Sequence, residues 1–243
     1  EMASEMLTAT GDSHAVGPAN FARMTVDARG QAELVGQVFL GVRLQCANCH
    51  NHPLDRWTQD DYHGLAAVFA RLERGRHVRV APHGAVTNLR TNEPAVPRIP
   101  GLRYLDPERD GRAEFARWVA SRDNPLVARA HVNRLWRTMF GRGLIEPADD
   151  LRATNPATHS ALLIRLAADF AEHGFDIRHT LRQIAASHVY ARSAASFSGD
   201  ESVEPFYSQA SFRPLEPEVM ADMLADVVGV PDEYPRQPAG TRA

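Results

Sequence analysis

The feature that most constrains the fold is a break in the helical pattern at residues 74–111. Apolar residues recur at helical spacing on both sides of this segment, whereas His77–Val80 alternates like a short strand. The segment then carries Pro82, Gly84, Pro94, Pro97, Pro100, Gly101 and Pro107, which break regular elements. The sequence therefore predicts a mainly α protein. Two small helical domains or subdomains, residues 1–73 and 112–243, would be joined by this linker or irregular excursion with at most a short hairpin.

Helix start signals support this class. Apolar spacing predicts a helix over residues 28–45. Thr58, with Asp61 three residues on, has the form of an N-cap with an acidic capping box. Asn124 and Pro125 have the form of an N-cap and a first helical residue. Further helices are predicted over residues 113–121, from a Thr158 cap to Gly174, over residues 177–186 and over residues 214–228.

Composition narrows the functional classes. The 243 residues carry 27 basic and 30 acidic side chains, and every basic one is Arg. A net charge of −3 with no polybasic segment argues against binding to nucleic acid or to an anionic membrane surface. No apolar run approaches the roughly 18 residues that span a bilayer, so no transmembrane segment is expected. The chain opens at Glu1 in mid-pattern, and we interpret it as a fragment whose signal peptide is missing.

The cysteines form the motif that points to chemistry. The chain has only two, Cys46 and Cys49, and His50 follows directly. A disulfide between residues three apart would close too short a loop to stabilise a fold, so a disulfide framework is excluded. Cys-x-x-Cys-His is the spacing for covalent haem attachment, in which the thiols reach the two vinyl groups and the histidine is the proximal iron ligand. Cys46, Cys49 and His50 are therefore candidate haem c residues.

Three other interpretations of the same residues stay open. Cys46 and Cys49 with His50 or His52 would supply three zinc ligands, and a remote histidine would have to complete the set of four. A thioredoxin-like redox pair is disfavoured, because it needs a strand before the motif and the preceding segment is predicted to be helical. The two cysteines would otherwise serve only in packing.

A haem iron held by His50 would also need a sixth ligand or an open site. The candidates are His52, His63, His131, Met24 and Met139. His52 is too close in sequence to reach the opposite face of the haem, so His63, His131 and Met139 are the preferred residues. Arg129, Arg134 and Arg137 share a predicted helix with His131, and they form either a set of donors for the haem propionates or, as we prefer, a solvated face.

Two parts of the chain resemble a known pair of domains of unknown function. The first resemblance is to the cytochrome-like domain of large secreted proteins abundant in planctomycetes. It rests on residues 39–53 (FLGVRLQCANCHNHP) and 57–62 (WTQDDY). The partner domain that follows it there is similar to residues 124–126 (NPL), 132–136 (VNRLW), 140–144 (FGRGL), 188–193 (HVYARS) and 213–216 (RPLE). The resemblance covers about residues 30–72 and 113–230.

The resemblance implies a bacterial protein exported to the periplasm or another extracytoplasmic site. Residues 1–73 would be the C-terminal part of a domain related to c-type cytochromes, and residues 112–243 a helical partner domain truncated at its C-terminus. His63 stands where an aromatic residue is usual in this motif, and Leu54 replaces a bulkier side chain.

The leading hypothesis is an extracytoplasmic c-type cytochrome that transfers electrons to an unidentified redox partner. The alternative is a non-redox binding or scaffold module in which the Cys-His cluster holds zinc or is purely structural. No nucleophile elbow, His-Glu-x-x-His motif or phosphate-binding loop is present, so the sequence supplies no catalytic constellation beyond the haem motif.

Overall fold

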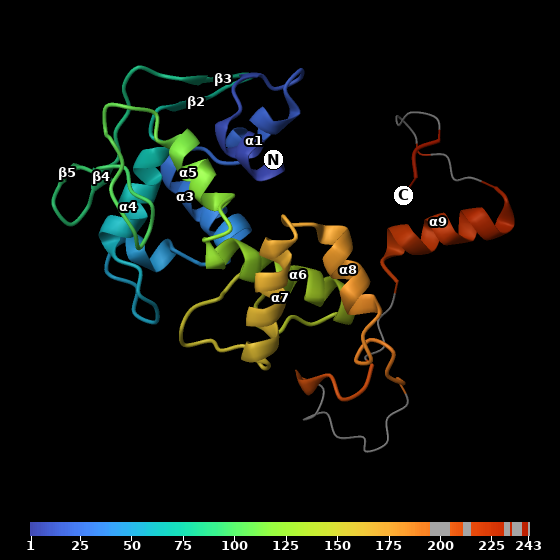
Figure 1. Cartoon of the computed structure of the whole chain (residues 1–243). Coiled ribbons are helices and arrows are strands. Elements are labelled where there is room, and N and C mark those ends of the chain that lie inside the picture. Colours follow the sequence, from blue (N-terminus) through green and yellow to red (C-terminus); the bar gives the residue numbers. More distant parts are fainter. Residues whose placement is uncertain (195–204, 211–214, 231–233, 235–239, 243) are drawn as a thin grey trace.

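The computed structural model of the chain describes residues 1–194, 205–210, 215–230, 234 and 240–242. Helices dominate this part of the chain, so the predicted mainly α class is confirmed (Figure 1). The α-helices are α1 (Met2–Thr8), α2 (Asn20–Arg23), α3 (Ala28–Val35), α4 (Gln59–Val68), α5 (Arg112–Val119), α6 (Pro125–Phe140), α7 (Ser160–Glu172), α8 (Ile177–Ala185) and α9 (Pro217–Val228). Shorter helical turns are η1 (Gly17–Ala19), η2 (Gly36–Leu40) and η3 (Gln45–Asn48).

Among the residues that the structure describes, five short strands make two small antiparallel sheets. They are β1 (Gly11–Asp12), β2 (Leu72–Arg74), β3 (His77–Val80), β4 (Thr87–Asn88) and β5 (Glu93–Pro94). The first sheet has the order β1-β3-β2, with Leu72 opposite Val80, and the second pairs Thr87 of β4 with Pro94 of β5. The strand predicted at His77–Val80 is β3, which pairs with strands that begin before residue 74. The hairpin that lies wholly within residues 74–111 is β4–β5, whose two-stranded ribbon tolerates the missing N–H of Pro94.

Residues 74–111 pack against the helices that precede them. The segment contributes Val78, Val86, Ile99 and Leu105 to the first hydrophobic cluster. Its backbone also bonds to α4, since Arg98 N donates to Gly64 O at 3.0 Å. The prolines thus exclude helix from this excursion without separating it from the core. The predicted domain bounds themselves stay a prediction.

The buried apolar residues form two clusters that meet at one helix. The first cluster runs from Leu7 to Val127 and includes Val35, Leu40, Leu65, Phe69 and Phe115. The second runs from Ala128 to Tyr207 and includes Val132, Trp136, Leu163, Phe170 and Ile184. Helix α6 contributes Leu126 and Val127 to the first and the rest of its buried face to the second. In Figure 1 the helices α7 and α8 flank α6, while α3, α4 and α5 lie at its other end.

Local capping signals predicted several helix starts correctly. Thr58 and Asp61 form a capping box at the start of α4, and Asn124 caps α6 with Pro125 at its first turn. Thr158 is not the N-cap of α7, because its hydroxyl donates to Leu144 O at 3.2 Å instead. The last predicted helix begins at Pro217, and residues 195–204 and 211–214, which include the start of the RPLE landmark, lie outside the described residues.

The helix predicted over residues 28–45 ends early. Helix α3 passes at Gly36 into the π-helical turn η2, which Gly41 closes with a left-handed φ of 66°. Glycine adopts this left-handed conformation readily because it has no Cβ. A Cβ added at Gly41 would also come within 2.8 Å of Ala130 Cβ. Residues 42–44 then continue without regular structure to η3, so a separate turn carries the cysteines.

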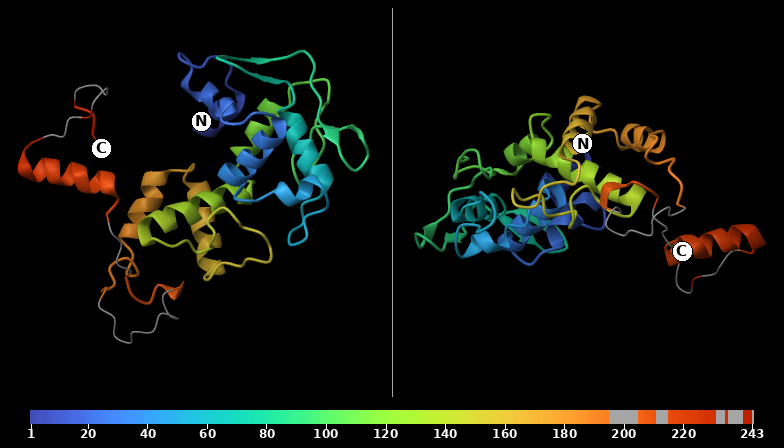
Figure 2. Two further views of the ribbon diagram at one scale, coloured as in Figure 1. Left: turned by 180° about the vertical axis from the view of Figure 1, so that it is seen from behind. Right: turned by 90° about the horizontal axis from the view of Figure 1, so that it is seen from below.

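Helix α9 has no buried residue, and both views of Figure 2 place it apart from the helices α3 to α8. Within the part of the chain that the structure describes, no helix is long and apolar enough to span a bilayer.

Replacing Gly41 by alanine tests the contact between η2 and α6. Both Gly41 and Gly174 have left-handed φ angles, 66° and 68°, but an added Cβ at Gly174 meets nothing within 4 Å. We expect Gly174→Ala to lower the free energy of unfolding by about 1–2 kcal/mol, because only the cost of a left-handed φ for a residue with a Cβ applies there. Gly41→Ala should cost on the order of 1–3 kcal/mol more, because its Cβ also overlaps Ala130 and Leu151. Equal losses in urea unfolding would contradict the close approach.

Candidate functional site

The cysteine motif lies on a turn that is anchored from beneath. Turn η3 carries Cys46, and Cys49 follows at its end. Both cysteines are exposed and both thiols are free, whereas Ala47 between them is completely buried. Leu44, directly before the turn, is buried as well. Apolar residues thus fix the turn to the first core while its two sulfur atoms remain accessible.

Polar contacts from α4 hold the inner side of the same turn. The carbonyl oxygen of Asn48 lies 3.1 Å from Nε2 of His63 and accepts a hydrogen bond from the Gln59 side chain at 3.4 Å. The side-chain oxygen of Asn51 accepts from the Gln59 backbone N–H at 3.1 Å. Because the Thr58 capping box fixes the start of α4, these bonds give the motif a defined position on the helix N-terminus.

His50 is exposed, and its ring has a defined tautomer. Nδ1 lies 2.8 Å from the backbone oxygen of Asn51. A carbonyl oxygen only accepts, so the proton of the neutral ring is on Nδ1 and Nε2 carries the lone pair. A metal-bound histidine needs this arrangement, in which a backbone carbonyl orients the ring through the nitrogen that does not bind the metal. Nε2 of His50 is therefore ready to bind a metal ion.

His63 lies beneath the motif in the core. Its side chain is completely buried, and Nε2 also lies 3.3 Å from the backbone N–H of Leu89. Nδ1 is buried without a hydrogen-bond partner. Burial lowers the pKa of His63, so the ring is neutral at pH 7. In the structure His63 supports the Asn48 carbonyl from the protein side of the turn, which gives it a structural role there.

Two further candidate axial ligands lie on α6, whereas Met24 follows α2 and is exposed. His131 bonds through Nδ1 to Val127 O at 2.9 Å, and its ring stacks on Phe39 at 6.5 Å. Met139 packs against the second hydrophobic cluster. His63 and His131 are thus engaged in two different places, and no hydrogen bond joins either ring to His50. The sixth ligand stays a prediction.

The structure does not assemble a zinc site at the cysteines. Among the described residues, the only three His, Cys, Asp or Glu side chains whose ligand atoms all lie within 4.8 Å of one another are Asp169, His173 and His179. Sequence reasoning missed this group. The signal was present as Asp169 and His173 four residues apart on one helix face, followed by His179 in the next helix.

Of the three arginines of α6, Arg137 is exposed as the predicted solvated face requires, whereas Arg129 and Arg134 are half-buried. Arg134 donates to the backbone carbonyls of Val38, at 2.6 Å, and of Gln37. Arg137 lies 3.5 Å from the Glu146 carboxylate. Arg134 therefore joins α6 to η2, and its donors are already used.

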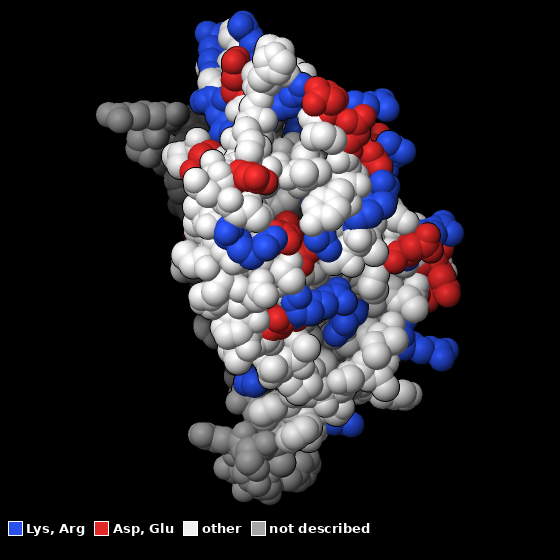
Figure 3. Space-filling model, turned by 90° about the vertical axis from the view of Figure 1, so that its left-hand side faces the viewer, with Lys and Arg blue, Asp and Glu red and all other residues white. Residues whose placement is uncertain are grey.

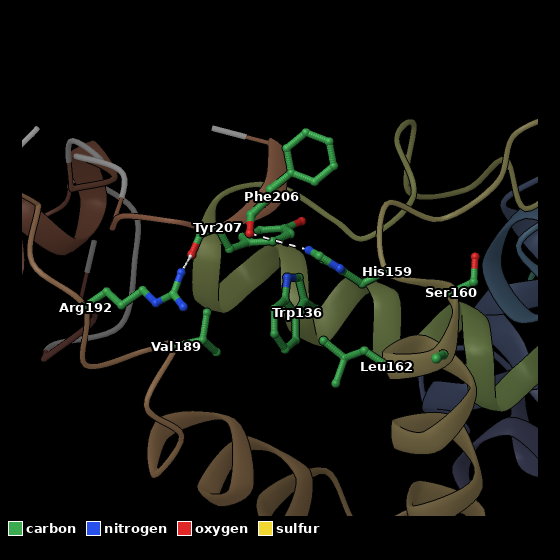
Figure 4. A pocket seen from close by; sticks show the side chains of 9 residues that line it. Trp136, His159, Ser160, Leu162, Val189, Arg192, Phe206 and Tyr207 are labelled. Atoms are coloured by element: carbon green, nitrogen blue, oxygen red, sulfur yellow. Dashed lines mark hydrogen bonds between the residues drawn. The ribbon is translucent and has the colours of Figure 1, made fainter. Parts of the chain in front are cut away.

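A cavity of about 480 Å³ lies at the edge of the second cluster. Trp136, His159, Arg192 and Tyr207 line it, as Figure 4 shows. Arg192 donates to Tyr207 O at 2.7 Å, and Nε2 of His159 lies 3.4 Å from Phe206 O. The hydroxyl of Ser160, which also lines the cavity, donates to Ala157 O at 3.2 Å, so it is not hydrogen-bonded to His159 as a nucleophile would be to its base. None of the sequence-predicted site residues lines it.

Surface charge agrees with the balanced composition. On the face drawn in Figure 3, acidic and basic side chains alternate over the surface. Charged side chains also pair across elements, for example Arg90 with Asp60 at 2.9 Å.

Comparison with protein families identifies both parts of the chain. Residues 111–241 match the family described as PSD1, a protein of unknown function (DUF1553). The chain belongs to the PSD1 family. Residues 3–74 match the domain described as PSCyt2, also a protein of unknown function (DUF1549). The resemblance to a cytochrome-like domain followed by its partner is thus confirmed for this PSD1 chain. No curated protein and no solved structure matches it.

The burial of His63 predicts a pH-dependent stability. Because its folded pKa is lowered, the unfolded chain takes up the proton first as the pH falls below about 6.5. Stability should therefore be full above pH 7 and decrease as the pH falls below about 6.5, by at most about 1.4 kcal/mol per pH unit for this group. Urea unfolding at several pH values should show a smaller decrease for His63→Gln.

The decrease should not vanish in that variant, because burial also lowers the pKa of His131. His83→Gln, which replaces an exposed histidine, is the control. An unchanged pH dependence in His63→Gln would show that His63 does not couple protonation to folding.

Proposed function

We propose that this PSD1 chain binds one haem covalently through Cys46 and Cys49, with His50 as the proximal ligand, and that it transfers electrons. One observation carries the proposal. A single turn, anchored by buried apolar residues, carries two exposed free thiols and a histidine whose Nδ1 bonds to a backbone oxygen. The name of the PSCyt2 domain supports a cytochrome-like assignment for residues 3–74. The haem would supply a one-electron redox centre.

The residues present fit covalent attachment. Each thiol S–H adds across one vinyl C=C bond, so that sulfur bonds to the carbon next to the ring, the hydrogen goes to the terminal carbon and no oxidant is needed. Both sulfur atoms must be reduced and accessible, and both are. His50 holds its Nδ1 proton against the Asn51 carbonyl and presents Nε2. The chain itself thus orients the ring of the donor.

The surroundings of the motif indicate what kind of redox site it would be. His50 is exposed, and the buried His63 is turned to the protein side. A haem held at this position would contact solvent over part of its surface, which is one of the properties that set reduction potentials. An exposed site also suits transfer to a separate redox protein at short range, and we infer that such a partner docks over the turn 46–50.

Compartment and architecture follow from the same proposal. Haem attachment to two cysteines takes place outside the cytoplasm, so we infer a periplasmic or other extracytoplasmic location. We also infer that the two family matches are two subdomains. The PSCyt2 match ends at residue 74 and the PSD1 match begins at residue 111, on either side of the irregular segment.

Zinc at the same cysteines is the less favoured alternative. Zinc in a structural site takes four nitrogen or sulfur ligands. The two thiols and His50 do not belong to the one three-residue group of closely spaced ligand atoms found among the described residues. A zinc site here would therefore require the turn to rearrange. Covalent haem attachment would use only the two thiols and one axial ligand, all of which the exposed turn already carries.

The test is covalent haem content. The chain is expressed in a periplasm that contains the haem-attachment machinery, and a reduced pyridine haemochrome spectrum is recorded after denaturation. We expect about one haem per chain with the band of two thioether bonds. Cys46→Ser and Cys49→Ser should each shift that band toward a vinyl haem, and the double variant should retain no covalent haem.

The matched control is His52→Asn, two residues beyond the motif. Its side-chain oxygen replaces His52 Nδ1 as acceptor for the Leu54 N–H, so haem content should be unchanged. His50→Ala should keep the thioether signal and change the spectrum of the native protein, because the proximal ligand is lost. A folded, colourless wild-type chain from cells that load a control cytochrome would contradict the proposal and favour the scaffold alternative.

A further inference from the structure

The junction of α7 and α8 brings two imidazoles and a carboxylate together, far from the cysteine motif in sequence. The rings of His173 and His179 stack with centroids 3.8 Å apart and planes inclined by 17°. The Asp169 carboxylate lies against both, 2.9 Å from Nε2 of His179 and 3.4 Å from Nδ1 of His173. One nitrogen from each ring and one carboxylate oxygen therefore lie within 4.8 Å of one another.

The local fold holds these side chains in place. Asp169 and His173 lie four residues apart, at the C-terminal end of α7. Gly174 and Phe175 then adopt left-handed φ angles of 68° and 62°, and Phe175 N donates back to Phe170 O at 2.8 Å. This compact turn joins α7 to α8 through the four residues 173–176.

The start of α8 is equally well defined. Asp176 caps it by accepting from Arg178 N at 2.8 Å and from His179 N at 3.1 Å. The ring of Phe175 packs edge-on against Phe170 at 5.4 Å. Because the turn, the cap and the aromatic contact are all local, the approach of His179 to α7 is preorganised.

A fourth polar group completes the cluster. The Gln183 side chain is one turn beyond His179 on α8, and its amide group lies 2.8 Å from Nε2 of His179 and 3.4 Å from Asp169 Oδ1. The four side chains thus form two pairs spaced i and i+4, one on each helix. Asp169 has 26% of its side-chain surface exposed and His179 has 28%, so an ion can reach the group from solvent.

We propose that Asp169, His173 and His179 bind one divalent transition-metal ion of the class of Zn²⁺. Two imidazole nitrogens and one carboxylate oxygen are ligands that such ions accept, and three protein ligands leave a position for water. The ion would replace the Asp169–His179 hydrogen bond and the 2.9 Å bond between His173 Nδ1 and the Asp169 backbone oxygen, and it would link the end of α7 to the start of α8. Because an ion lies in the plane of each imidazole that binds it, the two rings would also turn out of their stacked arrangement. Since this site is independent of the cysteines, it stands whether or not haem binds at His50.

The ligand set makes specific demands on the ion. Both imidazoles must be neutral to bind, so metal binding competes with protons and should weaken as the pH falls. The one carboxylate gives the site a single negative charge, and the neutral nitrogens favour Zn²⁺, Co²⁺ or Ni²⁺ over Mg²⁺ and Ca²⁺, which prefer oxygen ligands. Preference for Zn²⁺, Co²⁺ or Ni²⁺ over Mg²⁺ and Ca²⁺ would therefore distinguish this site from a nonspecific acidic surface.

The experiment uses the full chain with Cys46→Ser and Cys49→Ser, so that thiols cannot bind the ion. Equilibrium dialysis with Zn²⁺ should give one tight site per chain, and a Co²⁺ titration should give visible absorption without a thiolate charge-transfer band. Zn²⁺ at about 100 times its dissociation constant should raise the Tm by roughly 5–10 °C. Mg²⁺ at the same concentration should leave the Tm unchanged.

Variants then assign the ligands. In this background, His173→Ala and His179→Ala should each lower Zn²⁺ affinity at least about 100-fold, since even residues that only orient metal ligands account for 10–100-fold. His188→Ala, which removes an exposed histidine outside the cluster, is the control and should bind as the parent does. Gln183→Glu should tighten binding, because it places a second carboxylate beside His179.

Two outcomes would overturn the proposal. One is a cysteine-free chain that binds no Zn²⁺ although its circular dichroism shows the native helix content. The other is a His173→Ala/His179→Ala double variant that still binds one Zn²⁺ with the parent affinity. Gln183→Glu keeps the test decisive if an alanine variant fails to fold, since a gain in affinity cannot result from loss of structure.

Discussion

The packing of α6 against η2 is the contact on which the arrangement of the chain depends. Where α3 passes into the π-helical turn, the carbonyls of Gln37 and Val38 accept from the guanidinium of Arg134. Burial lowers the pKa of Arg134, and its donors compensate for that burial by satisfying main-chain oxygens at the helix end. Beside it, Gly41 lets the backbone approach Ala130 and Leu151 closely. The hydrogen bonds of Arg134 and the close backbone contact at Gly41 thus join the two hydrophobic clusters.

This contact also positions the cysteine motif, although no residue of α6 belongs to it. From Gly41 the chain runs to η3 with Val42 and Leu44 buried and Arg43 exposed. Arg43 pairs with Asp149 at 2.7 Å, while Leu151 N donates to Gly41 O at 2.8 Å. The segment that leads into the motif is therefore held by residues from the PSD1 part of the chain. The way the PSCyt2 part presents its thiols depends physically on its partner.

Local signals were predictable and packing-dependent ones were not. The Thr58–Asp61 capping box and the Asn124 cap are satisfied within three residues, so sequence spacing alone determines them. The Thr158 hydroxyl instead bonds to Leu144, and Gly41 ends the helix against Ala130, both through contacts that periodicity does not encode. The same distinction applies to the prolines of residues 74–111. They correctly exclude helix, but only packing shows that Ile99 and Leu105 fill the first core.

The candidate sites obey the same distinction. Cys46, Cys49 and His50 are adjacent in sequence, and a single turn arranges them, so the motif could be predicted in full. A sixth ligand must come from another element, and there the sequence could name only His63, His131 and Met139. Helix α4 places His63 beneath the turn, where Nε2 of its ring contacts the Asn48 carbonyl oxygen. The group of Asp169, His173 and His179 is intermediate. Its i and i+4 spacing is visible in the sequence, but the stacking of the two rings requires the left-handed turn at Gly174 and Phe175, which only the folded backbone supplies.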